Sequence, residues 1–202
     1  MNWPTVIVLA SGRGERFAAS GGTTHKLQAL LAGKTVLQHT LDAVQASGLP
    51  WHLEDGGHPG MGDSIAAAVR ATWQSSAQTS GWLILPGDLP LIQSDTLRAV
   101  AAALTGPDVV VPVYLGRRGH PVGFSARCGP ALLSLKGNKG AAAVVHAYGA
   151  IELIVNDVGC VTDIDTVADL SAAARLMPGA SALEALKGSA DRSSPWRPPI
   201  WP

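Results

Sequence analysis

Apolar residues follow two kinds of pattern along the chain. Short, nearly continuous apolar runs, typical of buried β-strands, cover residues 5–10, 82–85, 109–113, 122–124 and 151–155, with weaker runs at 51–54 and 159–161. Apolar residues at helical spacing predict helices over residues 35–47, 64–73, 94–104, 132–135, 141–148 and 166–174. Strands and helices that alternate in this way predict a three-layer α/β fold with a mostly parallel sheet.

Small polar residues mark the starts of two predicted helices. Asp63 or Ser64 is placed to cap one helix, and the pair Ser94-Asp95 is placed to cap the next. The glycine-flanked segment 60–64 also allows a flat ring to lie against the backbone. It is therefore either a capping motif alone or one wall of a base-binding pocket.

The first predicted strand runs directly into a glycine-rich, basic segment. Residues 11–14 read Ser-Gly-Arg-Gly, and Arg16 and Lys26 follow. Glycines let the backbone approach a bulky anion and turn its N–H groups toward it, and the basic side chains add full positive charge. Because open α/β sheets bind phosphates at such loops, this segment is a candidate phosphate site.

Two other phosphate-binding loops do not fit the segment. The dinucleotide fingerprint has Phe17 at its third glycine position, and a glycine-rich spacer follows where its helix should begin. The Walker loop ends in Gly-Lys-Thr, as residues 33–35 do, but Gln28 stands where its first glycine belongs. The remaining alternatives are an ordinary glycine-rich turn and an anion site, and the clustered basic residues favour the anion site.

Carboxylates follow the later strands. Asp88 lies in the turn after residues 82–85, and Asp163 and Asp165 precede the last predicted helix. Hard carboxylate oxygens across from a phosphate loop suit Mg²⁺, although a lone aspartate in a turn is often only turn chemistry. Because successive side chains of an extended segment alternate in direction, we expect one of the pair to reach the metal and the other to cap the helix or hold the loop. We expect Asp163 to be the metal ligand.

Composition narrows the function. Fifteen lysines and arginines balance fifteen aspartates and glutamates, so no charge footprint for nucleic acid or an anionic membrane is present. No apolar run approaches the ~20 residues of a bilayer span, and we see no signal peptide. Two cysteines, Cys128 and Cys160, suggest reduced thiols and a cytoplasmic protein.

The length fits one ordinary domain, which we expect to comprise residues 1–187. Residues 188–202 form a tail rich in proline and serine that carries Trp196 and Trp201. Proline density excludes a helix or central strand there. The tail is either disordered or docks its tryptophans on the domain or a neighbouring subunit.

Five segments in a fixed order resemble the MobA-like NTP transferase family, and within it the cytidylyltransferases of the molybdenum cofactor. They are residues 9–17 with His-Lys-Leu at 25–27, Pro-Gly-Asp-Leu-Pro at 86–90, Gly-His-Pro-Val at 119–122, Gly-Asn-Lys-Gly-Ala at 137–141 and Asp-Ile-Asp-Thr at 163–166. The resemblance spans residues 5–177. It implies a Rossmann-like, glycosyltransferase-A-like fold with some antiparallel pairing toward the C-terminal half.

The resemblance implies a Mg²⁺-dependent nucleotidyltransferase. It would join an NMP from an NTP, here CTP, to a phosphomonoester acceptor, here molybdenum-bearing molybdopterin, and release pyrophosphate. Ser11 stands where the cytidylyl branch has alanine and the guanylyl branch glycine, and a side chain there narrows the base pocket. A molybdoenzyme or its maturation factor is the implied protein partner.

The residues expected to act fall into four sets. The catalytic set is Arg16, Lys26 and Asp88, and the metal set is Asp88 and Asp163. The nucleotide set is Ala10, Ser11, Gly12, Arg13, Gly14, Arg16, Lys26, Gly62, Asp63 and Ser64. The acceptor set is His120, Pro121, Lys139 and Asp165, with Lys139 alternatively an exposed turn lysine.

Two other functions remain open. The first is a transferase of the same fold that acts on a sugar or polyol phosphate. The second is a non-catalytic carrier that hands the molybdenum cofactor to an apo-enzyme. The basic pair Arg16 and Lys26, together with Asp88 and Asp163, argues against a carrier, which needs no machinery for departing pyrophosphate.

Overall fold

The computed structural model describes residues 2–75 and 79–177. Its strands are β1 (Thr5–Leu9), β2 (Leu30–Leu31), β3 (Lys34–Thr35), β4 (Trp51–Glu54), β5 (Gly81–Pro86), β6 (Val109–Tyr114), β7 (Arg117–Arg118), β8 (Val122–Ser125) and β9 (Ala150–Ile154). Its helices are α1 (Glu15–Ala19), α2 (Val36–Ser47), α3 (Met61–Ser75), α4 (Ser94–Ala103), α5 (Gly129–Leu133), α6 (Ala142–Tyr148) and α7 (Val167–Leu176), with short 3₁₀ helices η1 (Lys26–Gln28), η2 (Ala126–Cys128) and η3 (Val158–Val161). The predicted tail at 188–202 and the predicted domain end at 187 lie outside the described residues.

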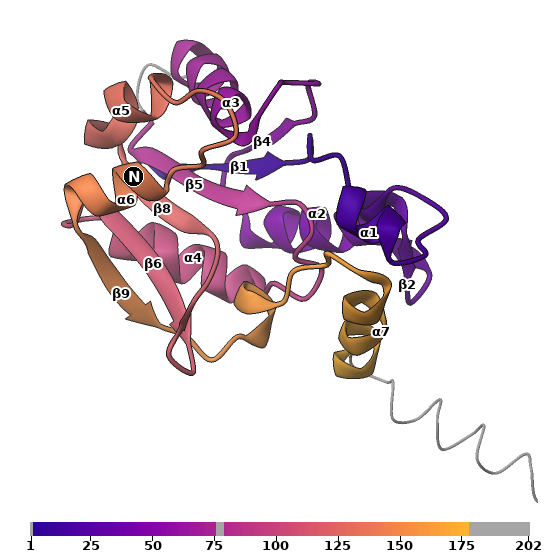
Figure 1. The fold of residues 1–202 in the computed structure, drawn as a ribbon. Coiled ribbons are helices and arrows are strands. Elements are labelled where there is room, and N and C mark those ends of the chain that lie inside the picture. Colours follow the sequence, from indigo (N-terminus) through magenta and orange to yellow (C-terminus); the bar gives the residue numbers. More distant parts are fainter. Residues whose placement is uncertain (1, 76–78, 178–202) are drawn as a thin grey trace, which may run out of the picture.

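Seven strands form one sheet in the order β4-β1-β5-β8-β6-β7, with β9 paired to β6, and β2 and β3 form a separate hairpin (Figure 1). β1 is parallel to β4 and β5, and β6 is parallel to β9. β8 lies antiparallel between β5 and β6, and β7 is antiparallel to β6. Strands β1, β4, β5, β6 and β9 therefore point the same way. The predicted mostly parallel α/β sheet is confirmed, and its antiparallel pairs involve β7 and β8.

Alternating side chains of the central strands divide the core into two layers. Val6 and Val8 of β1 pack in one cluster with residues of α2 and α4, whereas Ile7 packs in another with residues of α3, α5 and α6. All three side chains are fully buried, because every second residue of a strand faces the same side. Helices therefore cover both faces of the sheet (Figure 1).

A third apolar cluster joins α7 to the segment that follows β1. Phe17 and Leu27 pack there with Ile164 and Ala173, and all four are buried. These residues come from opposite ends of the described chain, and α7 lies close to α1 and β2 in Figure 1. The cluster brings the segment before α7 beside the loop after β1.

The apolar pattern predicts a strand at residues 159–161. This prediction is wrong, because these residues belong to the 3₁₀ helix η3. The Asp157 side chain accepts a hydrogen bond from the Gly159 N–H at 2.8 Å, which starts the turn. A Cβ on Gly159 would lie 2.0 Å from the Leu91 carbonyl oxygen. This close approach of two backbones leaves no room for a regular strand.

The predicted capping of α4 by Ser94 and Asp95 is also wrong. The start of this helix is bound by the buried carboxylate of Asp157, which accepts from the Gln93 N–H at 3.0 Å and the Thr96 hydroxyl at 2.7 Å. A carboxylate from a distant segment thus caps the helix, a role that the local sequence predicts for the helix's own first residues.

The two cysteines are buried free thiols. Burial raises the pKa of Cys160 to about 11 and also raises the pKa of Cys128. Neither thiol is therefore poised as a thiolate nucleophile.

Within residues 2–75 and 79–177, no helix combines the length and the apolar character that crossing a membrane requires.

Candidate active site

The loop after β1 is tied down by His25. Its ring Nε2 lies 2.6 Å from the Gly12 carbonyl oxygen, and its Nδ1 accepts a hydrogen bond from the Leu27 N–H at 3.3 Å. Since Nδ1 accepts, Nε2 carries the proton that is donated to Gly12. Gly14 has φ 66°, a left-handed conformation that favours glycine, and a Cβ there would lie 3.3 Å from the His25 ring. The histidine thus joins the loop to the segment that carries Lys26.

A short helix, rather than a glycine-rich spacer alone, follows the loop. α1 buries Phe17, and a Cβ on Gly22 would lie 2.2 Å from the Phe17 ring. The glycine is therefore needed for the chain to cross that ring and return toward η1. The expectation that no helix begins here was wrong, because the glycines come one short helix later.

The turn after β5 holds Asp88 opposite the loop. The Gly87 N–H donates to the Leu9 carbonyl at 2.9 Å, and the buried Thr40 hydroxyl donates to the Gly87 carbonyl at 3.1 Å. The Ile164 N–H donates to the Asp88 carbonyl at 3.0 Å. The turn is therefore fixed from three sides, by β1, by α2 and by the segment before α7.

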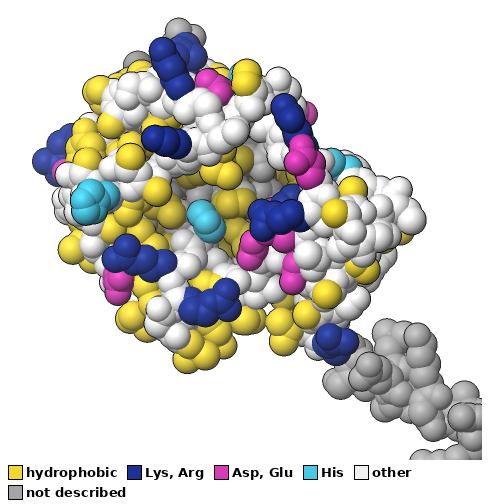
Figure 2. Space-filling model, viewed as in Figure 1, with side chains coloured by type: hydrophobic (Ala, Val, Ile, Leu, Met, Phe, Trp, Pro, Cys, Tyr) yellow, Lys and Arg dark blue, Asp and Glu magenta, His cyan; other side chains and the backbone are white. Residues whose placement is uncertain are grey.

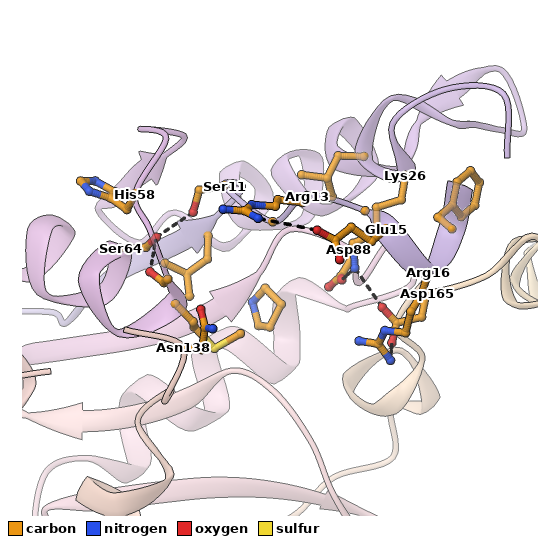
Figure 3. A pocket seen from close by; sticks show the side chains of 18 of the residues that line it. Ser11, Arg13, Glu15, Arg16, Lys26, His58, Ser64, Asp88, Asn138 and Asp165 are labelled. Carbon is orange, nitrogen blue, oxygen red and sulfur yellow. Dashed lines mark hydrogen bonds and ion pairs between the residues drawn. The ribbon is translucent and has the colours of Figure 1, made fainter. Parts of the chain in front are cut away.

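Lys26 lies between two carboxylates. Its Nζ is 2.5 Å from Asp88 Oδ2 and 3.0 Å from Asp165 Oδ1, and Arg16 pairs with Asp165 Oδ2 at 2.6 Å (Figure 3). Burial alone would lower the pKa of Lys26, but Asp88 and Asp165 outweigh burial, so the pKa is raised and the ammonium stays charged. The structure thus brings together four predicted site residues from three distant segments.

Asp88 retains an oxygen for a further cation. Its Oδ1 is buried and has no hydrogen-bond partner among the described residues. Asp88 and Asp165 line the same cavity, whereas Asp163 does not. Asp163 is exposed as a residue, and the burial of part of its side chain, with the Asp165 and Asp88 charges, raises its pKa. In the described part of the chain no cluster of three or more metal-binding side chains occurs. Mg²⁺ often takes only one or two carboxylates plus substrate phosphates, and Asp88 with Asp165 fits that pattern.

Neither Asp163 nor Asp165 caps α7. The Thr166 hydroxyl accepts from the Asp169 N–H at 3.2 Å, and the Asp169 carboxylate accepts from the Thr166 N–H at 2.7 Å. This reciprocal pair satisfies the helix start without help. Of the two roles expected for the second aspartate, capping the helix or holding the loop, the capping role is therefore taken by Thr166 and Asp169, and Asp165 bonds Lys26 and Arg16.

The cavity at this edge of the sheet has a volume of about 500 Å³, within the usual range for ligand sites. Figure 2 shows the molecule hollowed on this face, with basic and acidic side chains at the hollow's margin. Lys26, Arg16 and Asp165 lie at one end of the view in Figure 3, and Ser11, Ser64 and His58 at the other. The predicted residues that line the cavity are Ser11, Gly12, Arg13, Gly14, Arg16, Lys26, Ser64, Asp88 and Asp165.

Three predicted nucleotide residues, Ala10, Gly62 and Asp63, do not line the cavity. α3 begins two residues before Asp63, so neither Asp63 nor Ser64 caps it. The Asp63 carboxylate accepts instead from the Gly137 N–H at 2.9 Å. A Cβ on Gly62 would lie 2.7 Å from the carbonyl oxygen of the next loop at position 139. Gly62 and Asp63 therefore hold the loop before α6 against α3.

A second cavity of about 510 Å³ adjoins the first. The two share one residue each from β1, α3 and β5, namely Leu9, Met61 and Pro86. The lining of the second cavity is mostly apolar, with polar groups from Arg118, His120 and His146.

His120 connects this second cavity to Asp88 electrostatically. Burial lowers the pKa of His120, and the charges of Asp88 and Asp163 offset only part of that effect. Its Nδ1 is buried without a hydrogen-bond partner among the described residues. Of the other expected acceptor residues, Pro121 is buried beside it and Lys139 is exposed, and neither lines either cavity.

The profile of the MobA-like NTP transferase domain family matches residues 42–151, more than half of the chain. This chain belongs to the MobA-like NTP transferase family. The match contains Asp88 and His120 and begins after the loop and Lys26. The chain is also 32% identical over 130 residues to the purine catabolism protein PucB of Bacillus subtilis, a stretch that is 62% of this chain and 62% of PucB.

Solved structures share the MobA-like fold at lower identity. Rv0371c of Mycobacterium tuberculosis, in a complex with manganese, superposes with a TM-score of 0.68 at 22% identity and covers 87% of this chain and 100% of its own. The molybdopterin-guanine dinucleotide biosynthesis protein A of Archaeoglobus fulgidus superposes with a TM-score of 0.61 at 16% identity. This match covers 85% of this chain and 97% of the Archaeoglobus chain. At these identities the likeness shows the fold alone.

Sequence reasoning on this MobA-like chain missed several cavity residues, among them His58, Met61 and Asn138, which line the first cavity and were in none of the predicted site sets. Met61 precedes the predicted residue Gly62, and Asn138 lies in the predicted segment 137–141. Both could therefore have been found from their neighbours in the sequence. His58 lies in a short connection after the weak apolar run at 51–54, where no pattern distinguishes a pocket residue from an exposed one.

Proposed function

We propose that this MobA-like protein transfers an NMP from an NTP to a phosphomonoester acceptor and releases pyrophosphate. The observation that carries the proposal is the position of Lys26 between Asp88 and Asp165, beside a glycine- and arginine-rich loop. A basic group next to carboxylates at the end of a phosphate loop suits a triphosphate that arrives with a divalent cation.

Asp88 and Asp165 are the residues we assign to Mg²⁺, with Asp163 as the alternative second ligand. The unpartnered Asp88 Oδ1 supports this assignment, as does the manganese complex of the related Rv0371c. Bound magnesium supplies neutralisation of phosphate charge.

The basic residues of the chain would bind and orient the triphosphate. Loop residues 11–14, Arg16 and Lys26 would hold the β- and γ-phosphates and stabilise the departing pyrophosphate. An acceptor phosphate has its second pKa at about 6, so it is already largely ionised at neutral pH. The proposed transfer therefore needs no general base from the protein.

We propose CTP as the nucleotide and molybdopterin carrying molybdenum as the acceptor. The Ser11 and Ser64 hydroxyls lie 2.8 Å apart at the end of the cavity away from Lys26, which favours a small base. The mostly apolar lining of the second cavity favours an acceptor with a ring body over a sugar or polyol phosphate. A molybdoenzyme or its maturation factor would then receive the product.

The test is pyrophosphate release by the purified protein with Mg²⁺, each NTP in turn, and either molybdenum cofactor or a sugar phosphate. We expect release with CTP and molybdenum cofactor. The Asp88→Asn variant is the matched control. Release no greater than that of the variant with every NTP would refute nucleotidyl transfer, and binding of the cofactor without release would favour a carrier. Release only with a sugar phosphate would replace the proposed acceptor.

A further inference from the structure

A fixed carboxylate lies at the carboxyl end of β4, beside the first cavity. Glu54 is only 8% exposed, and its carbonyl accepts from the Ala10 N–H at 2.8 Å. Its Oε1 accepts from the Gly56 N–H at 3.0 Å and lies 3.1 Å from His58 Nε2. Its Oε2 lies 3.6 Å from His52 Nε2. Glu54 is therefore held by its own strand and by polar contacts on both oxygens.

This carboxylate orients the ring of His58. A Cβ on Gly56 would lie 2.9 Å from Glu54 Oε1 and 3.0 Å from His58 Nε2, so the glycine leaves the room in which the two side chains meet. The His58 N–H also donates to the Gly56 carbonyl at 2.7 Å. The ring is thus positioned by the backbone and by the carboxylate together.

The contact with Glu54 uses one ring nitrogen and leaves the other without a partner among the described residues. His58 lines the first cavity at the end with Ser11 and Ser64, away from Lys26 (Figure 3). Its Nε2 faces Glu54, and a carboxylate can only accept, so Nε2 carries the proton in the neutral ring. The other nitrogen, Nδ1, is then an acceptor, and no residue in the described part of the chain bonds to it.

We propose that His58 is a specificity-determining residue that reads the nucleobase through Nδ1 and selects a base with an amino group. The proposal rests on the proposed function, because it takes the end of the cavity away from Lys26 to hold the base. Cytosine offers the N4 amino group as a donor, whereas uracil has a carbonyl oxygen at the same position. Nδ1 would accept a hydrogen bond from the amino group of cytosine. With uracil, the lone pair of Nδ1 would face a lone pair of the carbonyl oxygen, which is unfavourable.

A purely structural role for His58 is the competing explanation, since its contact with Glu54 also closes the turn after β4. That role would use Nε2 alone and would be indifferent to the base. CTP and UTP are nearly the same size and differ in the group at position 4 and in the adjacent N3, which accepts in cytosine and donates in uracil. The change in their ratio of affinities when His58 is replaced therefore reports on Nδ1 and is insensitive to a general loosening of the turn.

The test measures binding of CTP, UTP and inorganic tripolyphosphate by calorimetry in the presence of Mg²⁺. For the wild-type protein we expect CTP to bind about tenfold more tightly than UTP, the effect of one hydrogen bond made or lost. His58→Ala and His58→Phe should bind CTP and UTP equally, and tripolyphosphate as the wild type does. The phenylalanine keeps the ring volume and removes both nitrogens. His39→Ala is the control, because His39 bonds the Leu31 carbonyl at 2.7 Å and lines neither cavity.

Three results would overturn the inference alone. A wild-type protein that binds CTP and UTP equally lacks the proposed selection. A His58 variant that keeps the wild-type ratio shows that another group reads the base. A variant that loses tripolyphosphate along with CTP shows that His58 supports the fold of the site. If the wild type binds neither an NTP nor tripolyphosphate, the proposed function fails, and the inference fails with it.

Discussion

Lys26 Nζ lies 2.5 Å from Asp88 Oδ2, and each side chain is only 14% exposed. A charge that has left water to this extent is stable only with a partner, and the Asp88 and Asp165 carboxylates raise the pKa of Lys26 so that its ammonium stays charged. Removing one leaves an uncompensated charge in a partly buried site. Substitution of Lys26 should therefore affect the binding of phosphates, whereas substitution of Asp88 should affect the binding of a divalent cation.

Lys26→Ala should weaken the binding of CTP while leaving that of cytidine unchanged. Losing one charge-assisted contact costs about 1.5–3 kcal/mol, and cytidine has no phosphate for Lys26 to contact. Calorimetric titration of both ligands makes the comparison. An equal loss of affinity for cytidine would contradict a phosphate-binding role, because it would point to a damaged base site or a damaged fold.

Asp88→Asn should abolish pyrophosphate release and leave the protein folded. The amide keeps the size of the side chain but loses the charge that a divalent cation requires. The fold of the turn should survive because its hydrogen bonds use the backbone of Gly87 and Asp88 and the hydroxyl of Thr40. Circular dichroism checks the fold, and turnover at saturating Mg²⁺ checks the role. Wild-type turnover would show that Asp88 is not the principal ligand.

The sheet was predictable because its signal is local. Residues 5–10 and 82–85 are continuous apolar runs, and their side chains do alternate between two buried layers. The loop and Asp88 were predictable for the same reason, since each directly follows such a strand. Position at the carboxyl end of a parallel strand is enough to place a residue at the sheet edge where ligands bind.

Most of the failures are contacts between distant segments, whereas the missed helix α1 is local. Asp157 binds the start of α4 from more than sixty residues away in sequence, and no local sequence pattern predicts this contact. Asp165 rather than Asp163 meets Lys26 because Ile164 anchors the segment to Asp88 and buries its own side chain. A sequence shows that the two aspartates alternate, but the direction of the alternation depends on that anchor.

The choice between Asp165 and Asp163 as second metal ligand can be tested without turnover. Mn²⁺ binding in the presence of CTP, followed by electron paramagnetic resonance, should weaken in Asp165→Asn and stay near wild type in Asp163→Asn. The reason is that Asp165 lines the cavity with Asp88 and Asp163 does not. The reverse order would restore Asp163 to the metal.

Asp163→Asn should stabilise the folded protein at neutral pH. Partial burial and the Asp165 and Asp88 charges raise the folded-state pKa of Asp163 above the ordinary value of 3.8. The stability that its protonated form contributes is present below the ordinary pKa and is lost as the pH rises through the raised one. Asparagine stays neutral throughout. The advantage of the variant in urea unfolding should therefore grow from acidic to neutral pH, and a difference that stays constant with pH would contradict the assigned cause.

His25→Ala should weaken triphosphate binding although His25 lines neither cavity. The ring holds the Gly12 carbonyl through Nε2 and the Leu27 N–H through Nδ1, so its loss frees the loop to turn a carbonyl toward the phosphates. Each hydrogen bond is worth about 1 kcal/mol, and tripolyphosphate should lose as much affinity as CTP. This equal loss separates His25 from His58, whose variants should spare tripolyphosphate. His39→Ala, which also removes a ring bond to a backbone carbonyl, should bind both ligands normally. Unchanged tripolyphosphate affinity in His25→Ala would show that the loop keeps its conformation unaided.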